Sequence, residues 1–153
     1  MKFMRFIFGV LFLFLLIFSG FSQHTITPED MIYFIMTDRF YDRNPDNNGS
    51  DRKNDITAYH GGDFKGLIEK LDYIEQLGFT AIWISPVVDN HFGGYHGYWA
   101  RDFKSVEEHF GTMETLRELV TKAHERNIKV IVDLVVNHTG VFHPWAQSEE
   151  YND

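Results

Sequence analysis

The chain has 153 residues, a formal net charge of −8 at pH 7 and no cysteine. An acidic chain of this kind is repelled by nucleic acid phosphate and by anionic lipid, so we expect no nucleic acid partner and favour a neutral ligand. Because disulfides and thiolate metal sites are excluded, the core and bound ions are expected to provide the stability.

The first 22 residues have the layout of a secretory signal peptide. Lys2 and Arg5 precede an apolar run over residues 6–18, and small residues follow it. The run is shorter than the roughly 20 apolar residues that a transmembrane helix needs. We expect cleavage after Ser22, a mature chain of 131 residues and charge −10 that begins at Gln23, a secreted or periplasmic location, and no membrane contact after cleavage. An uncleaved membrane anchor is the alternative.

The first half of the remaining chain predicts a strand, a loop and a helix. Residues 31–37 form a short apolar run without helical period, which is typical of a buried strand. Residues 42–51 are dense in Asp, Asn, Gly and Pro, which indicates a loop. Apolar residues at helical spacing over 67–77 predict a helix, and Gly78 is placed to end it in a left-handed conformation.

The second half repeats this order. Residues 80–85 are apolar and precede a proline, so they predict a second strand, and a loop rich in glycine and aromatic residues follows as far as Arg101. Thr112 is a suitable cap for a second helix that Asn127 would end. The apolar run over 128–134 predicts a third strand.

Strands that alternate with helices in this way predict parallel βαβ units and an α/β fold. The pattern alone leaves open whether the sheet is doubly wound or part of a barrel. A complete (β/α)8 barrel needs roughly 250 residues, well above the 131 of the expected mature chain.

Polar and aromatic clusters follow each predicted strand, and three of them form recognisable motifs. Asp133-Leu-Val-Val-Asn-His138 resembles the first short signature of the alpha-amylase family of glycoside hydrolases. Residues 95–103 resemble the loop after the family's second strand. Residues 37–40 and the Asp/Asn loop resemble the first strand and calcium loop of bacterial alpha-amylases and cyclodextrin glucanotransferases. The match runs from Asp30 to about Gly140 and implies that residues 23–153 form a partial TIM (β/α)8 barrel, roughly its first three βα units.

The same resemblance implies a site for α-glucans such as starch or maltodextrin. Tyr98 would stack on the sugar at the cleavage point, His96 would contact the neighbouring sugar, and His138 would bind hydroxyl groups; Trp99 belongs to the same substrate-binding set. Considered without the family, a Tyr–His pair in a loop is more often packed or solvated. A zinc site of His91, His96 and His138 is less favoured, because cysteine and close histidine spacing are lacking.

Two Ca²⁺ sites are also implied. Asn137 resembles a ligand of the calcium that the family widely shares, while Asp133 resembles a structural carboxylate that orients an arginine of a later strand. The residues that match a second calcium site are Asp42, Asn44, Asn47, Asn48, Gly61 and Asp63. Their oxygens suit a hard cation. The alternative is a solvated turn over 42–48 with Asp63 as a helix N-cap.

The catalytic carboxylates are expected to lie beyond Asp153. Retaining glycoside hydrolysis needs a nucleophile and an acid/base about 5 Å apart, and the family places these after its fourth and fifth strands. No residue here matches them, so we expect a fragment that is inactive alone. A non-catalytic secreted module that binds calcium or glucan is the alternative, and an unrelated α/β domain is a third.

Overall fold

The computed structural model describes residues 25–49 and 52–148, so the expected signal segment lies outside the described residues. Within these two ranges, no helix has the length and apolar character to cross a membrane. Strands alternate with helices along the chain, which confirms the predicted α/β fold. Closure into a barrel stays a prediction.

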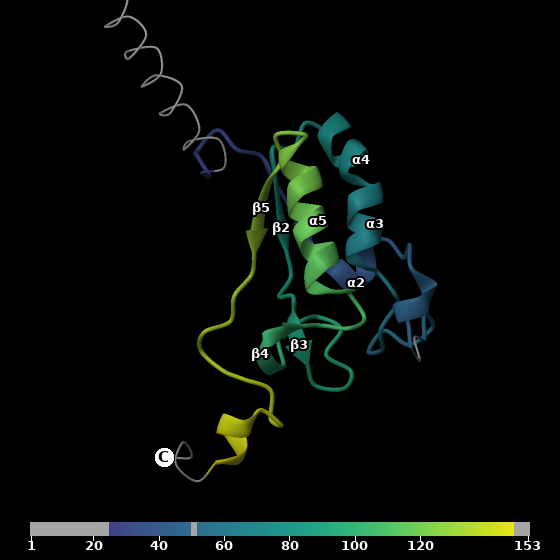
Figure 1. The fold of residues 1–153 in the computed structure, drawn as a ribbon, viewed down its shortest axis with the longest axis vertical. Helices are drawn as coiled ribbons and strands as arrows, with labels where there is room; N and C mark the ends of the chain where they lie inside the picture. The colour runs from purple at the N-terminus through teal and green to yellow at the C-terminus, as the bar shows by residue number, and fades with distance from the viewer. Residues whose placement is uncertain (1–24, 50–51, 149–153) are drawn as a thin grey trace, which may run out of the picture.

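Three parallel strands form the central sheet: β1 (Ile32–Ile35), β2 (Ala81–Ile84) and β5 (Lys129–Val132), with β2 in the middle. The helices lie along one face of this sheet (Figure 1). On the other face, Phe34 and Trp83 meet edge to face and remain 47% and 40% exposed. A parallel sheet is normally covered on both sides, so this face is uncovered in the described part of the chain.

Five apolar side chains of the helices and of β2 are fully buried between the helices and the sheet. They are Phe64, Leu67, Leu71, Ile74 and Ile82. The helices are α2 (Thr37–Phe40), α3 (Phe64–Glu69), α4 (Leu71–Gln76) and α5 (Met113–His124), and the 3-10 helices are η1 (Pro45–Asn47) and η2 (Pro144–Gln147).

Several helix boundaries follow the predicted signals. The Thr112 side chain accepts a hydrogen bond from the Thr115 amide and caps α5. Asn127 and Gly78 have φ of 58° and 87°, so both helical segments end in left-handed residues as predicted. Asp63 caps α3, with its Oδ1 accepting a hydrogen bond of 2.6 Å from the Gly66 amide.

Two predicted elements are wrong in detail. The helix expected over 67–77 is broken at Lys70, whose backbone N–H is shared between the Gly66 and Leu67 carbonyls. This shared bond tightens the turn, yet apolar residues on both sides of the break keep facing the sheet. Thr37, predicted at the end of the first strand, instead begins α2; its amide donates to Ser85 Oγ at 3.2 Å.

A hairpin lies where a loop was predicted. β3 (Val88–Asn90) pairs antiparallel with β4 (Ala100–Val106), and the pairing is irregular on both sides of Asp89. Polar residues occupy much of β4, so apolar residues do not alternate along it clearly enough to predict a strand. The hairpin presents the segment between its strands, residues 91–99, beside the carboxyl end of the sheet (Figure 1).

Candidate functional site

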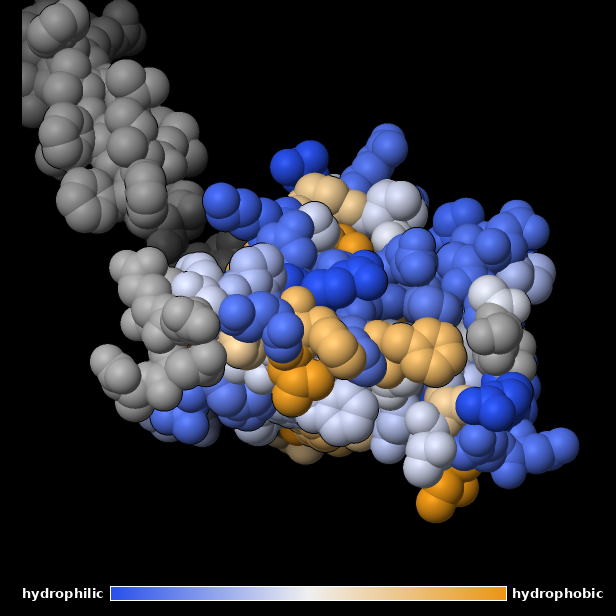
Figure 2. All heavy atoms as spheres, turned by 90° about the horizontal axis from the view of Figure 1, so that it is seen from below, coloured by the Kyte–Doolittle hydropathy of each residue, from blue (hydrophilic) through white to orange (hydrophobic). Residues whose placement is uncertain are grey.

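The motif-bearing segments gather at the carboxyl end of the parallel strands. The loop after α2, the β3–β4 hairpin and the segment after β5 all lie there (Figure 1). From below, this end shows apolar side chains set among polar ones (Figure 2). Parallel α/β sheets place ligand sites at this edge, so the structure supports the predicted location.

Tyr98 joins two of the motifs. Its hydroxyl donates to Asp133 Oδ2 at 2.8 Å, and its carbonyl lies 3.0 Å from Nε2 of His138. Burial, and next the hydrogen bond to Asp133, raise the pKa of Tyr98, so its hydroxyl stays protonated at neutral pH. Asp133 holds Tyr98 in place within the described residues, and its expected role toward an arginine of a later strand stays a prediction.

His96 is fixed by its neighbours. Its Nδ1 accepts the Tyr98 amide at 2.9 Å, its ring stacks with Tyr98 at a centroid distance of 5.8 Å, and it meets Trp99 edge to face at 4.5 Å. Burial, followed by the positive charge of Arg39, lowers the pKa of His96. The ring is therefore neutral near pH 7. The structure brings all four predicted sugar-binding residues together, while Trp99 keeps 48% of its surface exposed.

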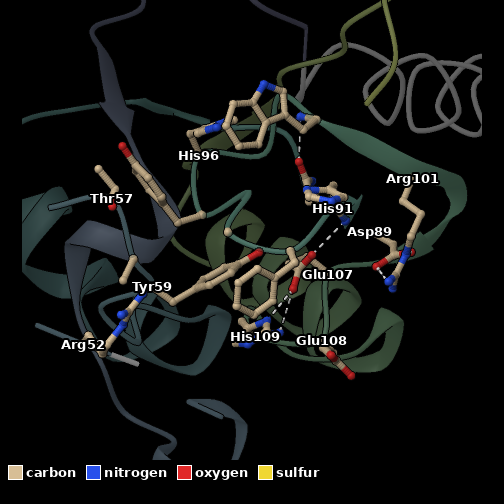
Figure 3. A pocket seen from close by; sticks show the side chains of 16 residues that line it. Arg52, Thr57, Tyr59, Asp89, His91, His96, Arg101, Glu107, Glu108 and His109 are labelled. Carbon is tan, nitrogen blue, oxygen red and sulfur yellow. Dashed lines mark hydrogen bonds and ion pairs between the residues drawn. The ribbon is translucent and has the colours of Figure 1, made fainter. Parts of the chain in front are cut away.

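A cavity of about 550 Å³ lies beside this cluster. His96 and Trp99 line it, but Tyr98 and His138 do not. In Figure 3, Glu107 and His109 lie on the opposite side from His96, and the Arg101–Asp89 ion pair lies at the edge. The cavity thus adjoins the predicted sugar-contacting residues instead of coinciding with them.

The six residues predicted for the second calcium site lie close together. Asp42 Oδ2 accepts Nδ2 of Asn48 at 2.9 Å and Nζ of Lys53 at 2.8 Å, and Asp63 Oδ2 accepts the Asn44 amide at 2.7 Å. Burial raises the pKa of Asp42, but the hydrogen bonds from Lys53 and Asn48 outweigh it and lower the pKa overall. The carboxylate is therefore ionised at neutral pH.

Unpartnered oxygens make this loop suitable for a cation. Oδ1 of Asn47 and Oδ1 of Asn48 are buried and accept no hydrogen bond within the described residues. Gly61, at φ 90°, leaves space beside Oδ1 of Asn48 that a side chain would fill, since a Cβ there would lie 2.9 Å from side-chain atoms of Asn48 and Asp42. Buried acceptors without donors are costly, and calcium takes amide and carboxylate oxygens. The donor set therefore fits calcium.

The structure also bears on the alternatives to metal binding at the predicted calcium ligands. Asp63 does cap a helix, as the alternative proposed, while its metal role stays a prediction. Asn137 is exposed, and its segment after β5 lies on the opposite side of the molecule from the Asp42 loop (Figure 1). In the ranges that the structure describes, no three His, Cys, Asp or Glu side chains form a metal-binding group.

A buried polar group at the end of the hairpin was not predicted from the sequence. Glu107 is 2% exposed and contacts His109, which stacks on Tyr59 at a centroid distance of 3.9 Å. The buried Asp38 was not predicted either; its carboxylate accepts the His60 amide at 2.9 Å. In the sequence, Glu107 and Glu108 are two adjacent acidic residues, a pattern typical of a solvated surface. Only tertiary packing shows that Glu107 is buried and Glu108 is exposed.

These features define an α/β domain in which aromatic and histidine side chains gather at the carboxyl ends of the parallel strands. The family model for the alpha amylase catalytic domain matches residues 34–153. The chain therefore belongs to the alpha-amylase family. This finding confirms the resemblance that the three motifs carry.

Among curated relatives, the chain is 52% identical over 128 residues to a beta/alpha-amylase of Paenibacillus polymyxa, covering 80% of this chain and 11% of that protein. It is 46% identical to a cyclomaltodextrin glucanotransferase of a Bacillus species, a match that covers 72% of this chain and 18% of that protein. Among solved structures, an Anoxybacillus alpha-amylase is 54% identical with a TM-score of 0.78, and the match covers 80% of this chain and 27% of that one. A Geobacillus thermoleovorans alpha-amylase solved with acarbose is 50% identical with a TM-score of 0.72, and the match covers 79% of this chain and 26% of that one. The chain thus spans about a quarter or less of the length of these relatives.

Proposed function

We propose that this chain is the N-terminal part of a retaining glycoside hydrolase barrel that acts on α-glucans. The observation that carries the proposal is the cluster of Tyr98, His96 and His138 at the carboxyl end of the sheet, with Tyr98 held by Asp133. An aromatic face matches the apolar C–H face of glucose. The histidines offer donors and acceptors for its hydroxyl groups. The relatives, one of them solved with acarbose, support the same substrate class.

In this role the chain binds the glucan but does not perform the chemical step. Retaining hydrolysis needs two carboxyl groups about 5 Å apart across the scissile bond. Two carboxylates near the predicted sugar-contacting residues are otherwise engaged: Asp133 accepts the Tyr98 hydroxyl, and Asp89 pairs with Arg101 at 2.7 Å. We expect the catalytic pair to come from later strands of the same barrel.

Calcium would serve as a structural ion. Asp42, Asn44, Asn47, Asn48, Gly61 and Asp63 would hold one ion, and Asn137 would contribute to a separate one. In the first site the ion would satisfy the two buried amide oxygens of the Asp42 loop and join that loop to the start of α3. Its contribution would be stability, with no part in bond cleavage.

Export is the remaining part of the proposal. The support is the charge and apolar pattern of residues 1–22. The exported protein is expected to have the mass of a chain that begins at Gln23. A membrane-bound protein that retains Met1 would contradict export and release.

A binding measurement tests the glucan proposal. We expect the exported chain that begins at Gln23 to bind maltoheptaose and to release no reducing sugar from starch. Tyr98→Ala should weaken binding roughly tenfold, which corresponds to about 1.4 kcal/mol of lost stacking. The matched control is Tyr73→Ala. Tyr73 is 49% exposed on α4, away from the carboxyl ends of the strands, so its loss should leave the affinity unchanged.

Two results would count against this proposal. Equal affinities for wild type and Tyr98→Ala would remove Tyr98 from the site. Joining residues 25–148 to the remaining barrel of the Anoxybacillus alpha-amylase should produce starch hydrolysis, whereas a stand-alone binding module would remain inactive in that chimera.

A further inference from the structure

Glu107 is a buried carboxylate at the end of the hairpin, outside the predicted sugar-contacting set. It lies just after β4 and is 2% exposed. Its Oε1 accepts Nδ1–H of His109 at 2.6 Å and the His109 amide at 3.3 Å, and its Oε2 accepts the Asn90 amide at 2.8 Å. Both carboxylate oxygens are thus committed to donors, which offsets the cost of burial.

Asn90 carries this contact to the segment between the strands. Its Oδ1 accepts the Trp99 amide at 2.7 Å, and its Nδ2 donates to the Val88 carbonyl at 2.6 Å. The amide of His91 donates to the Trp99 carbonyl at 3.0 Å. The two ends of the segment 91–99 are therefore closed by hydrogen bonds that begin at Glu107.

The packing on the far side of Glu107 keeps it in place. His109 stacks face to face on Tyr59, with an interplanar angle of 11°, and Nδ2 of Asn47 donates to the His109 carbonyl at 2.7 Å. Burial, followed by the charge of Glu107, raises the pKa of Tyr59, so its hydroxyl stays protonated. Figure 3 shows Tyr59, Glu107 and His109 together on one side of the cavity.

We infer that Glu107 is a positioning residue for the glucan site: through Asn90 it sets the conformation of the segment that carries His96, Tyr98 and Trp99. The inference rests on the proposed glucan function. Glu107 itself does not contact the sugar-binding side chains; it acts on the backbone from which they extend.

The role requires a carboxylate. Three N–H groups point at the two Glu107 oxygens, and a carboxylate has acceptor sites for all of them without a donor of its own. In Glu107→Gln, one oxygen becomes an NH2 group. His109 Nδ1 can change from donor to acceptor by tautomerisation, but the backbone amides of Asn90 and His109 cannot, so the NH2 group must face one of these two N–H groups. A buried donor then loses its acceptor, so the closure at Asn90 and Trp99 loosens although the side chain keeps its size.

Hydrogen exchange of the Trp99 amide tests the link directly. In Glu107→Gln this amide should exchange at least tenfold faster than in wild type. The Ile84 amide, in the central strand, serves as reference because a general loss of stability would accelerate it as well. The matched control is Ser105→Ala, which removes an exposed hydrogen bond to Asp102 on the same strand and should change neither rate.

Maltoheptaose affinity tests the functional part. Glu107→Gln and Asn90→Ala should each weaken binding about fivefold, and the double variant should be no weaker than the single ones, because both break one connection. Unchanged Trp99 exchange, or independent effects that multiply in the double variant, would overturn the inference. A wild-type chain that binds no maltoheptaose would instead contradict the proposed function, and the exchange rates would still decide whether Glu107 holds the segment.

Discussion

Chelation of calcium is expected to lower the melting temperature of the chain, and Asp42→Ala should remove part of that response. An ion that binds only the folded state at a hundredfold excess over its dissociation constant adds about 2.7 kcal/mol to the free energy of unfolding. Each kcal/mol corresponds to about 2–8 °C in a domain of this size. Asp42→Ala removes the carboxylate that faces Asn48 and Lys53. The calcium ion at the separate Asn137 site would account for the part of the melting-temperature shift that Asp42→Ala retains.

The control is a second aspartate of the same loop. Asp46 lies on η1 and is exposed, so Asp46→Ala removes equal charge without touching the buried oxygens of Asn47 and Asn48. Thermal melts with calcium and with chelator should show a full response in Asp46→Ala and a reduced one in Asp42→Ala. If Asp42→Ala responds to calcium as wild type does, the loop is an ordinary solvated turn.

The sequence predicted those parts of the fold that depend on local periodicity and caps. Apolar runs located β1, β2 and β5, and Thr112, Asn127 and Gly78 marked helix ends, because capping geometry depends on residues three or four positions apart. Motif position after each strand also predicted the grouping of Tyr98, His96 and His138, since parallel strands end at one edge.

The features that escaped prediction depend on distant contacts. β3 has three residues and is paired irregularly, so no period of two develops along it. The break at Lys70 leaves the apolar spacing intact and is therefore invisible in the sequence. Burial of Glu107 arises from Asn90 and Tyr59, residues 17 and 48 positions away, and nothing near it in the chain distinguishes it from the exposed Glu108.

Gly97 shows how tightly the backbone constrains the segment that carries the predicted sugar-contacting residues. It lies between His96 and Tyr98, has φ of 87°, and a Cβ there would lie 2.2 Å from the Pro86 carbonyl oxygen. The oxygen belongs to the backbone just after β2, so no side-chain rotation can relieve the collision. Gly93 has a similar φ of 81°, but a Cβ there meets nothing within 4 Å.

We therefore expect Gly97→Ala to be far more damaging than Gly93→Ala. Both variants bear the cost of an alanine in the left-handed region, about 1–2 kcal/mol, and only Gly97→Ala adds the collision with Pro86, which overpacking data place at about 1–3 kcal/mol. Urea unfolding should show this difference in the free energy of unfolding. Because the segment must shift away from Pro86, Gly97→Ala should also lose maltoheptaose binding, while Gly93→Ala retains it. Equal stability and equal affinity of the two variants would show that this segment is free to move and that the close approach of Gly97 to Pro86 does not shape the site.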